Sequence, residues 1–271
     1  MSQTSEVVIA GVGLADAKTK SRWPAIMDVA QSMSGLILGL FMWGHMFLVS
    51  SILISQDAFW AVTKAFKGYF IAGDTYPIVD SIIVAFIAAV FVVHAFLAMR
   101  KFPANYTQYR AFIGQYKLLQ HHDTTLWWVQ AVTGFVLFFL AFPHLFQMMM
   151  YPSDIDPYQS GTRFWSGWWP LYLVLLFAVE LHGGIGLYRL VVKWGVFEGK
   201  DPNATRKTLT KVKWALTAFF LVLGLVTFAA YMKIGYEIRH TPNEIYTPAW
   251  LQNPPQAEAP FWWPSWIKEH K

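Results

Sequence analysis

Apolar residues are gathered into five long blocks that shorter polar segments separate. The blocks cover Ile26–Ile54, Ile78–Arg100, Thr124–Met150, Trp169–Lys193 and Val212–Tyr236. Each is close to or longer than the ~20 residues that an α-helix needs to cross the hydrocarbon core of a bilayer. The pattern therefore predicts an all-α integral membrane protein, with a bundle of five transmembrane helices over residues 26–236.

Polar segments flank the predicted bundle on both sides. In residues 1–25 the short apolar stretch Val7 to Ala15 is followed, not preceded, by cations, which is the wrong order for a cleaved signal peptide. Residues 237–271 are rich in Pro, Asn, Gln and Trp. We expect the first segment to be cytoplasmic and the second to be an irregular external tail without chemistry of its own.

Positive charge is distributed unevenly between the two sides of the bundle. The N-terminal segment, the Arg100–Gln120 loop and the Arg189–Lys213 region hold 14 of the 21 Lys and Arg residues. The positive-inside rule then predicts a cytoplasmic N-terminus and a periplasmic C-terminus. The net charge of +5 is explained by these loops, so we expect membrane lipid as a partner and no nucleic acid.

The composition excludes several kinds of site. The chain is 55% hydrophobic and 14% charged and has no cysteine. A soluble domain does not have this composition in long apolar blocks. Because there is no thiolate, an iron–sulfur cluster or a disulfide would have to belong to a partner.

Four predicted helices each carry one histidine inside the apolar block: His45, His94, His144 and His182. The helical rise of ~1.5 Å per residue puts His94 and His182 in the inner half or near the middle, and His45 and His144 nearer the outer end. Each histidine could simply hydrogen-bond a neighbouring helix. Four histidines that match in depth by pairs favour two bis-histidine b-type haems, stacked across the membrane, with an electron-transfer function.

A carboxylate and five possible propionate donors accompany the histidines. Glu180 lies about 200° around its helix from His182, so it does not face the same haem edge. It could carry protons or form a structural hydrogen bond, and the sequence leaves both open. Donors to haem propionates are needed at the membrane edges. The candidates are Gln31, Ser32, Trp127, Arg163 and Lys193.

Four long segments resemble a known family of membrane proteins. They are QSMSGLILGLFMWGHMF (Gln31–Phe47), HAFLAMRKFP (His94–Pro103), HDTTLWWVQAVTGF (His122–Phe135) and WPLYLVLLFAVELHGGIGLYRLVVKWG (Trp169–Gly195). The chain resembles the single-polypeptide, dihaem cytochrome b membrane anchor of quinol:fumarate reductase and succinate:quinone oxidoreductase, the five-helix type of epsilon- and deltaproteobacteria. The resemblance covers nearly the whole chain up to Tyr236.

The resemblance implies roles for the candidate residues. His94 and His182 would bind the iron of the proximal haem, and His45 and His144 that of the distal haem. Glu180 would carry protons alongside transmembrane electron transfer. Positions that match donors to the proximal propionates are Gln31, Ser32, Trp127 and Lys193.

The resemblance also implies a complex in the bacterial inner membrane. Its partners would be a flavoprotein subunit with covalent FAD, which interconverts fumarate and succinate, and an iron–sulfur subunit. Menaquinol or menaquinone would react near the distal haem, and this chain alone would be inactive toward fumarate. The complex would be a dimer of heterotrimers. Fumarate reduction and succinate oxidation would use the same electron-transfer path, so the sequence does not fix the direction of the reaction.

One position departs from the family pattern. In its best-known members a glutamate in the loop after the first span accepts protons at the quinol site, whereas the alignable segment VTKAFKGYF has Lys67 there. A lysine cannot do this at neutral pH without a large pKa shift. Asp57 and Asp74 in the same loop are candidates to replace the glutamate.

Two alternative functions remain open. A dihaem cytochrome b of a formate dehydrogenase or hydrogenase would also explain the histidines, although the shared segments do not support it. A proton-coupled transporter without haem would use Glu180 and the histidines for proton movement. The transporter predicts a colourless protein, whereas both cytochromes predict a strong Soret band.

Overall fold

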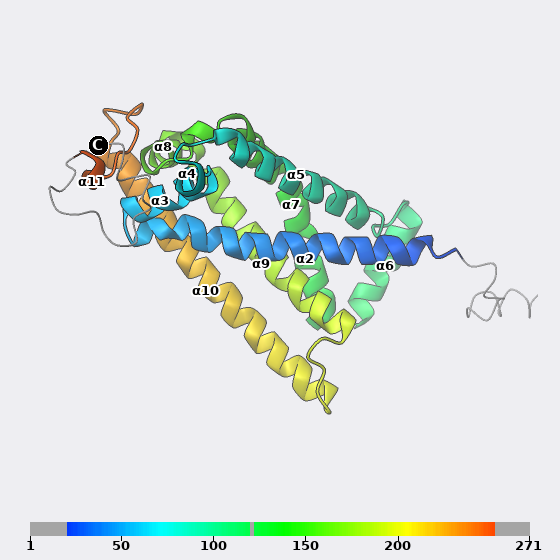
Figure 1. The fold of residues 1–271 in the computed structure, drawn as a ribbon. Helices are drawn as coiled ribbons and strands as arrows, with labels where there is room; N and C mark the ends of the chain where they lie inside the picture. The colour runs from blue at the N-terminus through cyan, green and yellow to red at the C-terminus, as the bar shows by residue number, and fades with distance from the viewer. Residues whose placement is uncertain (1–20, 120–121, 253–271) are drawn as a thin grey trace, which may run out of the picture.

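The computed structural model describes residues 21–119 and 122–252, which contain helices and no strand (Figure 1). Five helical runs are long and apolar enough to cross a membrane, which confirms the five predicted spans. Their main helices are α2 (Trp23–Ser50), α5 (Pro77–Met99), α7 (His122–Met150), α9 (Trp169–Trp194) and α10 (Pro202–Glu237). Most of the predicted N-terminal segment and residues 253–271 of the predicted tail lie outside the described residues.

The outward faces of the long helices are apolar. On α5, the side chains of Ile82, Phe86 and Phe96 are among the large exposed hydrophobic groups, and Phe96 is 74% exposed. Soluble proteins rarely expose contiguous apolar surface on this scale, whereas hydrocarbon around a membrane span covers it. The chain is therefore a multi-pass membrane protein whose exterior contacts lipid.

Shorter helices gather at the two ends of the bundle (Figure 1). One end, here called the α6 end, carries α6 (Tyr106–Leu119) between α5 and α7. The opposite end is called the α8 end. Its short elements are η2 (Ser51–Leu53), α3 (Gln56–Phe66), α4 (Tyr69–Ala72), η3 (Pro152–Asp154), α8 (Pro157–Arg163) and α11 (Ala249–Gln252).

The fourth span contains a break that the apolar pattern did not predict. The helical run begins at Pro157 and passes through the π-helical turn η4 (Phe164–Trp168) before α9 begins at Trp169. Gly167 has a φ of 107° within that turn, a backbone conformation that side chains with a Cβ rarely adopt. The following Pro170 has no N–H and sits in the first turn of α9, where none is needed.

The fifth span is longer than predicted. Helix α10 begins at Pro202, ten residues before the predicted start at Val212, because the Asp201 side chain accepts hydrogen bonds from the backbone N–H groups of Asn203 and Ala204. Its 36 residues span roughly 54 Å at 1.5 Å per residue, which exceeds the ~30 Å of a hydrocarbon core. The polar first turns of α10 therefore extend beyond the hydrocarbon.

Helices α8 and α10 touch through two glycines. A Cβ on Gly161 would lie 2.8 Å from Ile234 Cγ2 and 2.9 Å from the backbone nitrogen of Gly235. Small residues allow two helices to approach backbone to backbone. This contact fixes the short helix α8 against the last span at the α8 end.

We predict that Gly161→Val destabilises the protein. The added methyl groups would overlap the backbone of α10, and overpacking of this kind costs about 1–3 kcal/mol. The measurement is tryptophan-detected thermal unfolding in detergent, where Tm should fall. Gly114→Val in α6 is the control, because no heavy atom lies within 4 Å of a Cβ at Gly114. Equal Tm values for the two variants would contradict the prediction.

Candidate functional site

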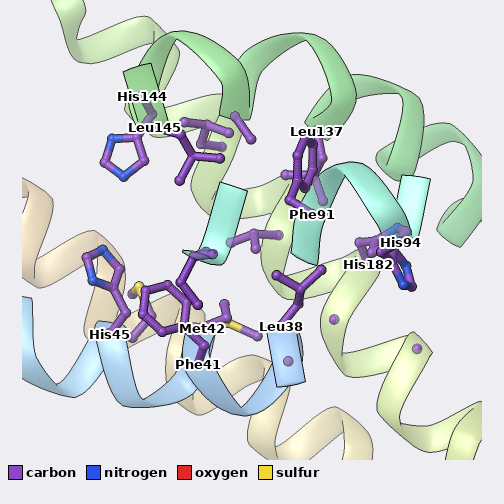
Figure 2. Close-up of a pocket in the computed structure, with 18 of the residues that line it drawn as sticks. Leu38, Phe41, Met42, His45, Phe91, His94, Leu137, His144, Leu145 and His182 are labelled. Carbon is purple, nitrogen blue, oxygen red and sulfur yellow. The ribbon is translucent and has the colours of Figure 1, made fainter. Parts of the chain in front are cut away.

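A cavity of about 1010 Å³ runs between the long helices from one end of the bundle to the other. Gln31 and Lys193 line it toward the α6 end, and Asp80 and Arg163 line it toward the α8 end. All four histidines singled out in the sequence line this cavity. Figure 2 shows that their imidazole rings form two groups with apolar side chains between them.

The first histidine pair joins α5 to α9. The ring centres of His94 and His182 are 6.3 Å apart, and the ring planes are almost perpendicular, at 88°. Nδ1 of His182 donates a hydrogen bond to the backbone oxygen of Gln130 at 2.8 Å. Nδ1 of His94 lies 3.1 Å from the hydroxyl oxygen of Ser34. The second ring nitrogen, Nε2, is thereby left available in both residues.

The second pair joins α2 to α7. The ring centres of His45 and His144 are also 6.3 Å apart, with the planes inclined at 56°. Phe41 stacks on His45, and the ring of Tyr172 meets His144 edge-on. Nδ1 of His144 is buried and has no hydrogen-bond partner in the part of the chain that the structure describes.

Both separations suit one iron between two imidazoles. A metal–imidazole nitrogen bond is about 2.0 Å long and the ring centre lies about 1.1 Å beyond the nitrogen, so two rings on opposite sides of one metal have centres roughly 6.2 Å apart. Among the described residues there is no group of three or more His, Cys, Asp or Glu that could hold a metal ion. The arrangement therefore fits an iron that brings its own equatorial ligands, as haem iron does.

The walls between the pairs have space for a flat, apolar group. Leu38, Phe91 and Leu137 separate the two pairs (Figure 2). Gly35 and Gly134 pass close behind the rings, since a Cβ at these positions would lie 3.0 Å from His94 Cε1 and 2.9 Å from His182 Cε1. These glycines let the helices approach and hold the imidazoles in place.

The predicted propionate donors fall at opposite ends of the cavity. Gln31, Ser32, Trp127 and Lys193 line it together at the α6 end. Arg163 lines the α8 end, where its guanidinium donates to the backbone oxygen of Asp154 at 2.8 Å. The structure thus brings four of the five candidates together and separates the fifth.

The sequence analysis missed a charged cluster at the α6 end. Lys193 pairs with Asp28 and also donates to the Ser32 hydroxyl at 3.1 Å. Asp28 pairs with Lys101 at 2.5 Å as well, and both Lys101 and Arg189 line the cavity. Cations near the ends of α5 and α9 were the available signal, but the sequence did not show which of them face inward.

Glu180 is fully buried and does not line the cavity. Neither carboxylate oxygen has a hydrogen-bond partner among the described residues. The indole of Trp43 on α2 approaches the carboxylate without reaching hydrogen-bond geometry. This placement agrees with the helical rotation that separates Glu180 from His182.

Lys67 is buried at the α8 end, with 3% of its surface exposed. Its ammonium donates to the backbone oxygen of Ile155 at 3.2 Å and lies 3.9 Å from Oδ2 of Asp80. Burial lowers the pKa of Lys67, and the Asp80 carboxylate opposes this shift. Asp80 lines the cavity and was not recognised in the sequence.

The two aspartates proposed as replacements for the family glutamate lie elsewhere. Asp57 accepts a hydrogen bond from the Tyr246 hydroxyl at 2.5 Å, which holds the tail segment against α3. Burial and this carboxylate together raise the pKa of Tyr246. Asp74 is exposed and accepts from the backbone N–H of Thr75 at 2.7 Å. Neither aspartate lines the cavity.

Comparison with known proteins identifies close relatives. Residues 104–224 match the family described as the succinate dehydrogenase/fumarate reductase transmembrane subunit. The fumarate reductase cytochrome b subunit of Wolinella succinogenes is 56% identical over 235 residues, which cover 86% of this chain and 91% of the relative. The fumarate reductase cytochrome b subunit of Helicobacter pylori (strain ATCC 700392 / 26695) is 50% identical over 236 residues, with coverages of 87% and 91%.

We predict that Gly134→Ala weakens haem binding. The new methyl group would displace the His182 ring and its hydrogen bond to Gln130, and loss of such an orienting contact weakens metal binding by about 10-fold. Haem content per purified chain measures the effect. Gly44→Ala is the matched control, since no heavy atom lies within 4 Å of its Cβ. Unchanged haem content in Gly134→Ala would contradict this account.

Proposed function

The chain belongs to the family of fumarate reductase cytochrome b subunits, and on this basis we propose that it passes electrons between menaquinol and the iron–sulfur subunit of its complex through two b-type haems. As a family member it is a membrane anchor of a fumarate reductase complex. The iron–sulfur subunit and a flavoprotein with FAD carry the fumarate chemistry. The assembly is a dimer of such heterotrimers.

One observation carries this proposal: two pairs of imidazoles, each 6.3 Å apart, line one apolar cavity at two depths. His94 and His182 hold one iron, and His45 and His144 hold the other. Two b-type haems held by these histidine pairs would supply one-electron carriers and would not bind oxygen. Leu38, Phe91 and Leu137 keep water away from the space between the pairs (Figure 2).

Orientation in the inner membrane follows from the positive charge. The α6 end faces the cytoplasm and the iron–sulfur subunit, because α6 and the first turns of α10 carry an excess of cations. His94 and His182 are then the proximal ligands, and His45 and His144 the distal ones. The C-terminal tail lies on the periplasmic side.

Side chains at the α6 end bind the propionates of the proximal haem. Gln31, Ser32, Trp127 and Lys193 line the cavity there and supply hydrogen-bond donors. Asp28 holds Lys193 and Lys101 at this edge. Arg163 is positioned for the propionates of the distal haem at the α8 end.

Glu180 carries a proton across the bundle beside the haems. A carboxyl group buried without a hydrogen bond is costly when charged and much less costly when protonated. A site of this kind in a membrane span accepts and releases a proton more readily than it holds a fixed charge. Its position away from the cavity separates proton movement from the haem chain.

Haem counting on single-histidine variants tests the proposed function. Wild-type protein should contain two haems per chain, and alanine at His45, His94, His144 or His182 should remove one of them, measured by reduced-minus-oxidised spectra with haem quantification. His240→Ala, at an exposed position in the tail, is the control. A wild-type chain without haem would overturn the proposal.

Pairing of the ligands has its own test. The double variant His45→Ala with His144→Ala should lose no more haem than either single variant, because both residues hold the same iron. The combination of His45→Ala with His94→Ala should lose both haems. The opposite pattern would show that the pairs are wrongly assigned.

Glu180→Gln should keep both haems and slow quinol-dependent fumarate reduction at least 10-fold. Glutamine keeps the shape of a protonated carboxyl group but cannot release a proton, and positioned proton transfer commonly contributes a factor of ~10²–10⁴. Glu237→Gln, at an exposed position at the end of α10, controls for the loss of a carboxylate. An unchanged rate in Glu180→Gln would leave Glu180 with a structural role.

A further inference from the structure

A buried charge pair lies at the α8 end of the cavity, apart from the four histidines. Asp80 stands in the first turn of α5 and is 8% exposed, and Lys67 at the end of α3 is 3% exposed. Their charged groups are 3.9 Å apart. Asp80 lines the cavity whereas Lys67 does not, so the lysine stands behind the carboxylate.

Two further contacts fix the pair in place. The backbone N–H of Tyr76 donates to the carbonyl oxygen of Lys67 at 2.8 Å, which closes the loop between α3 and α5. Ser81, next to Asp80, donates its hydroxyl to the backbone oxygen of Met149 at 2.7 Å, which ties α5 to the end of α7. The carboxylate is therefore held at the cavity wall by three elements.

The Asp80 carboxylate has hydrogen-bonding capacity to spare. Within the described part of the chain, its one charged partner is Lys67, at a distance beyond that of a direct hydrogen bond. A charged group in an apolar membrane cavity is costly and is commonly retained for binding or proton transfer. The oxygen that faces the cavity can accept a proton or a hydrogen bond from a ligand.

The surrounding walls indicate the class of that ligand. Phe59, Phe66 and Phe164 line the same end of the cavity, with Phe164 stacked on Tyr172 and Tyr231. Aromatic side chains of this kind form a wall that suits an apolar ring system. Arg163 is the other charged side chain that lines this end, among the described residues. An apolar ring system with a weakly acidic hydroxyl group matches this combination, which is the chemistry of a naphthoquinol.

We propose that Asp80 is the proton acceptor for the quinol, and that Lys67 is a positioning residue whose positive charge favours the carboxylate form of Asp80. The inference rests on the proposed function, because that function supplies the quinol as substrate. It identifies Asp80 as a carboxylate that can accept the proton in a region where the loop between α3 and α4 carries Lys67 and not an acidic residue.

Proton transfer from the quinol to Asp80 needs no oxidant or reductant. The O–H bond of the quinol breaks, its electron pair stays on the quinol oxygen, and an O–H bond forms on the Asp80 carboxylate. The products are a quinolate anion and a neutral carboxyl group. In the reverse direction, the protonated Asp80 returns the proton to the quinolate.

Lys67 acts through its charge, which burial disfavours and nearby carboxylates favour. Lys64 on the same helix opposes the ammonium charge, whereas Asp80, Asp154 and Asp156 favour it. Asp156 is itself buried, which raises its pKa, and it accepts hydrogen bonds from the backbone N–H groups of Tyr158 and Tyr246. Burial lowers the pKa of Lys67, and these three carboxylates oppose that effect.

Kinetics on the complete purified complex test the proposal, with 2,3-dimethyl-1,4-naphthoquinol as donor and fumarate as acceptor. Asp80→Asn should lower kcat about 100-fold while KM stays within about threefold, because the amide still binds the hydroxyl but accepts no proton. Lys67→Met should also lower kcat, and Lys67→Arg should restore most of it. Asp74→Asn, the same change at an exposed site in the same loop, should leave kcat unchanged.

An infrared difference spectrum between the quinol-bound and quinol-free complex gives a second readout. The band of a newly protonated carboxyl group should appear in wild type and be missing in Asp80→Asn. A wild-type kcat in Asp80→Asn, or the same carboxyl band in that variant, would overturn the proposal.

Further measurements separate this proposal from the function on which it rests. Haem content and the rate of fumarate reduction by a reduced viologen dye should stay at wild-type levels in all variants. If Asp80→Asn does not assemble, the neutral pair Lys67→Met with Asp80→Asn leaves no unpaired buried charge and replaces it in the assay. A haem-free wild-type complex, or one inactive with naphthoquinol, would instead refute the proposed function.

Discussion

The separation of the imidazoles within each pair is the constraint on which the rest of the bundle depends. His94 and His182 join α5 to α9, and His45 and His144 join α2 to α7 across the cavity (Figure 2). A shift of one helix along its neighbour by a single residue, ~1.5 Å, would move a ring out of reach. The separation within each pair therefore depends on how closely these four helices pack.

Different contacts hold the imidazoles in the two histidine pairs. In the pair nearer the α6 end, glycines stand directly behind the rings, and Gln130 and Ser34 meet their Nδ1 atoms. In the other pair, Nδ1 of His144 is buried without a partner among the described residues, and aromatic rings hold the imidazoles instead. Hydrogen bonds therefore orient the first pair, whereas packing orients the second.

The sequence predicted the features that depend on local composition. Apolar runs gave the five spans, and one histidine in each of four runs gave the candidate ligands together with their depths. Contacts between residues far apart in the chain could not be predicted in this way. Asp28 meets Lys193 because α2 and α9 pack together, and Asp80 meets Lys67 because the chain turns sharply at Gly68, where φ is 84°. The spacing of apolar residues along the chain does not show which distant side chains come into contact.

The charge pair at the α8 end restricts how this protein can evolve. Loss of either Lys67 or Asp80 alone leaves one buried, uncompensated charge, which commonly costs 3–5 kcal/mol, whereas replacing both at once with apolar residues is often nearly neutral. The two positions are therefore coupled, because a change at one alters the effect on stability of a change at the other. Replacing both residues would keep the fold but would remove the proposed proton acceptor, so stability and function together favour keeping both charges.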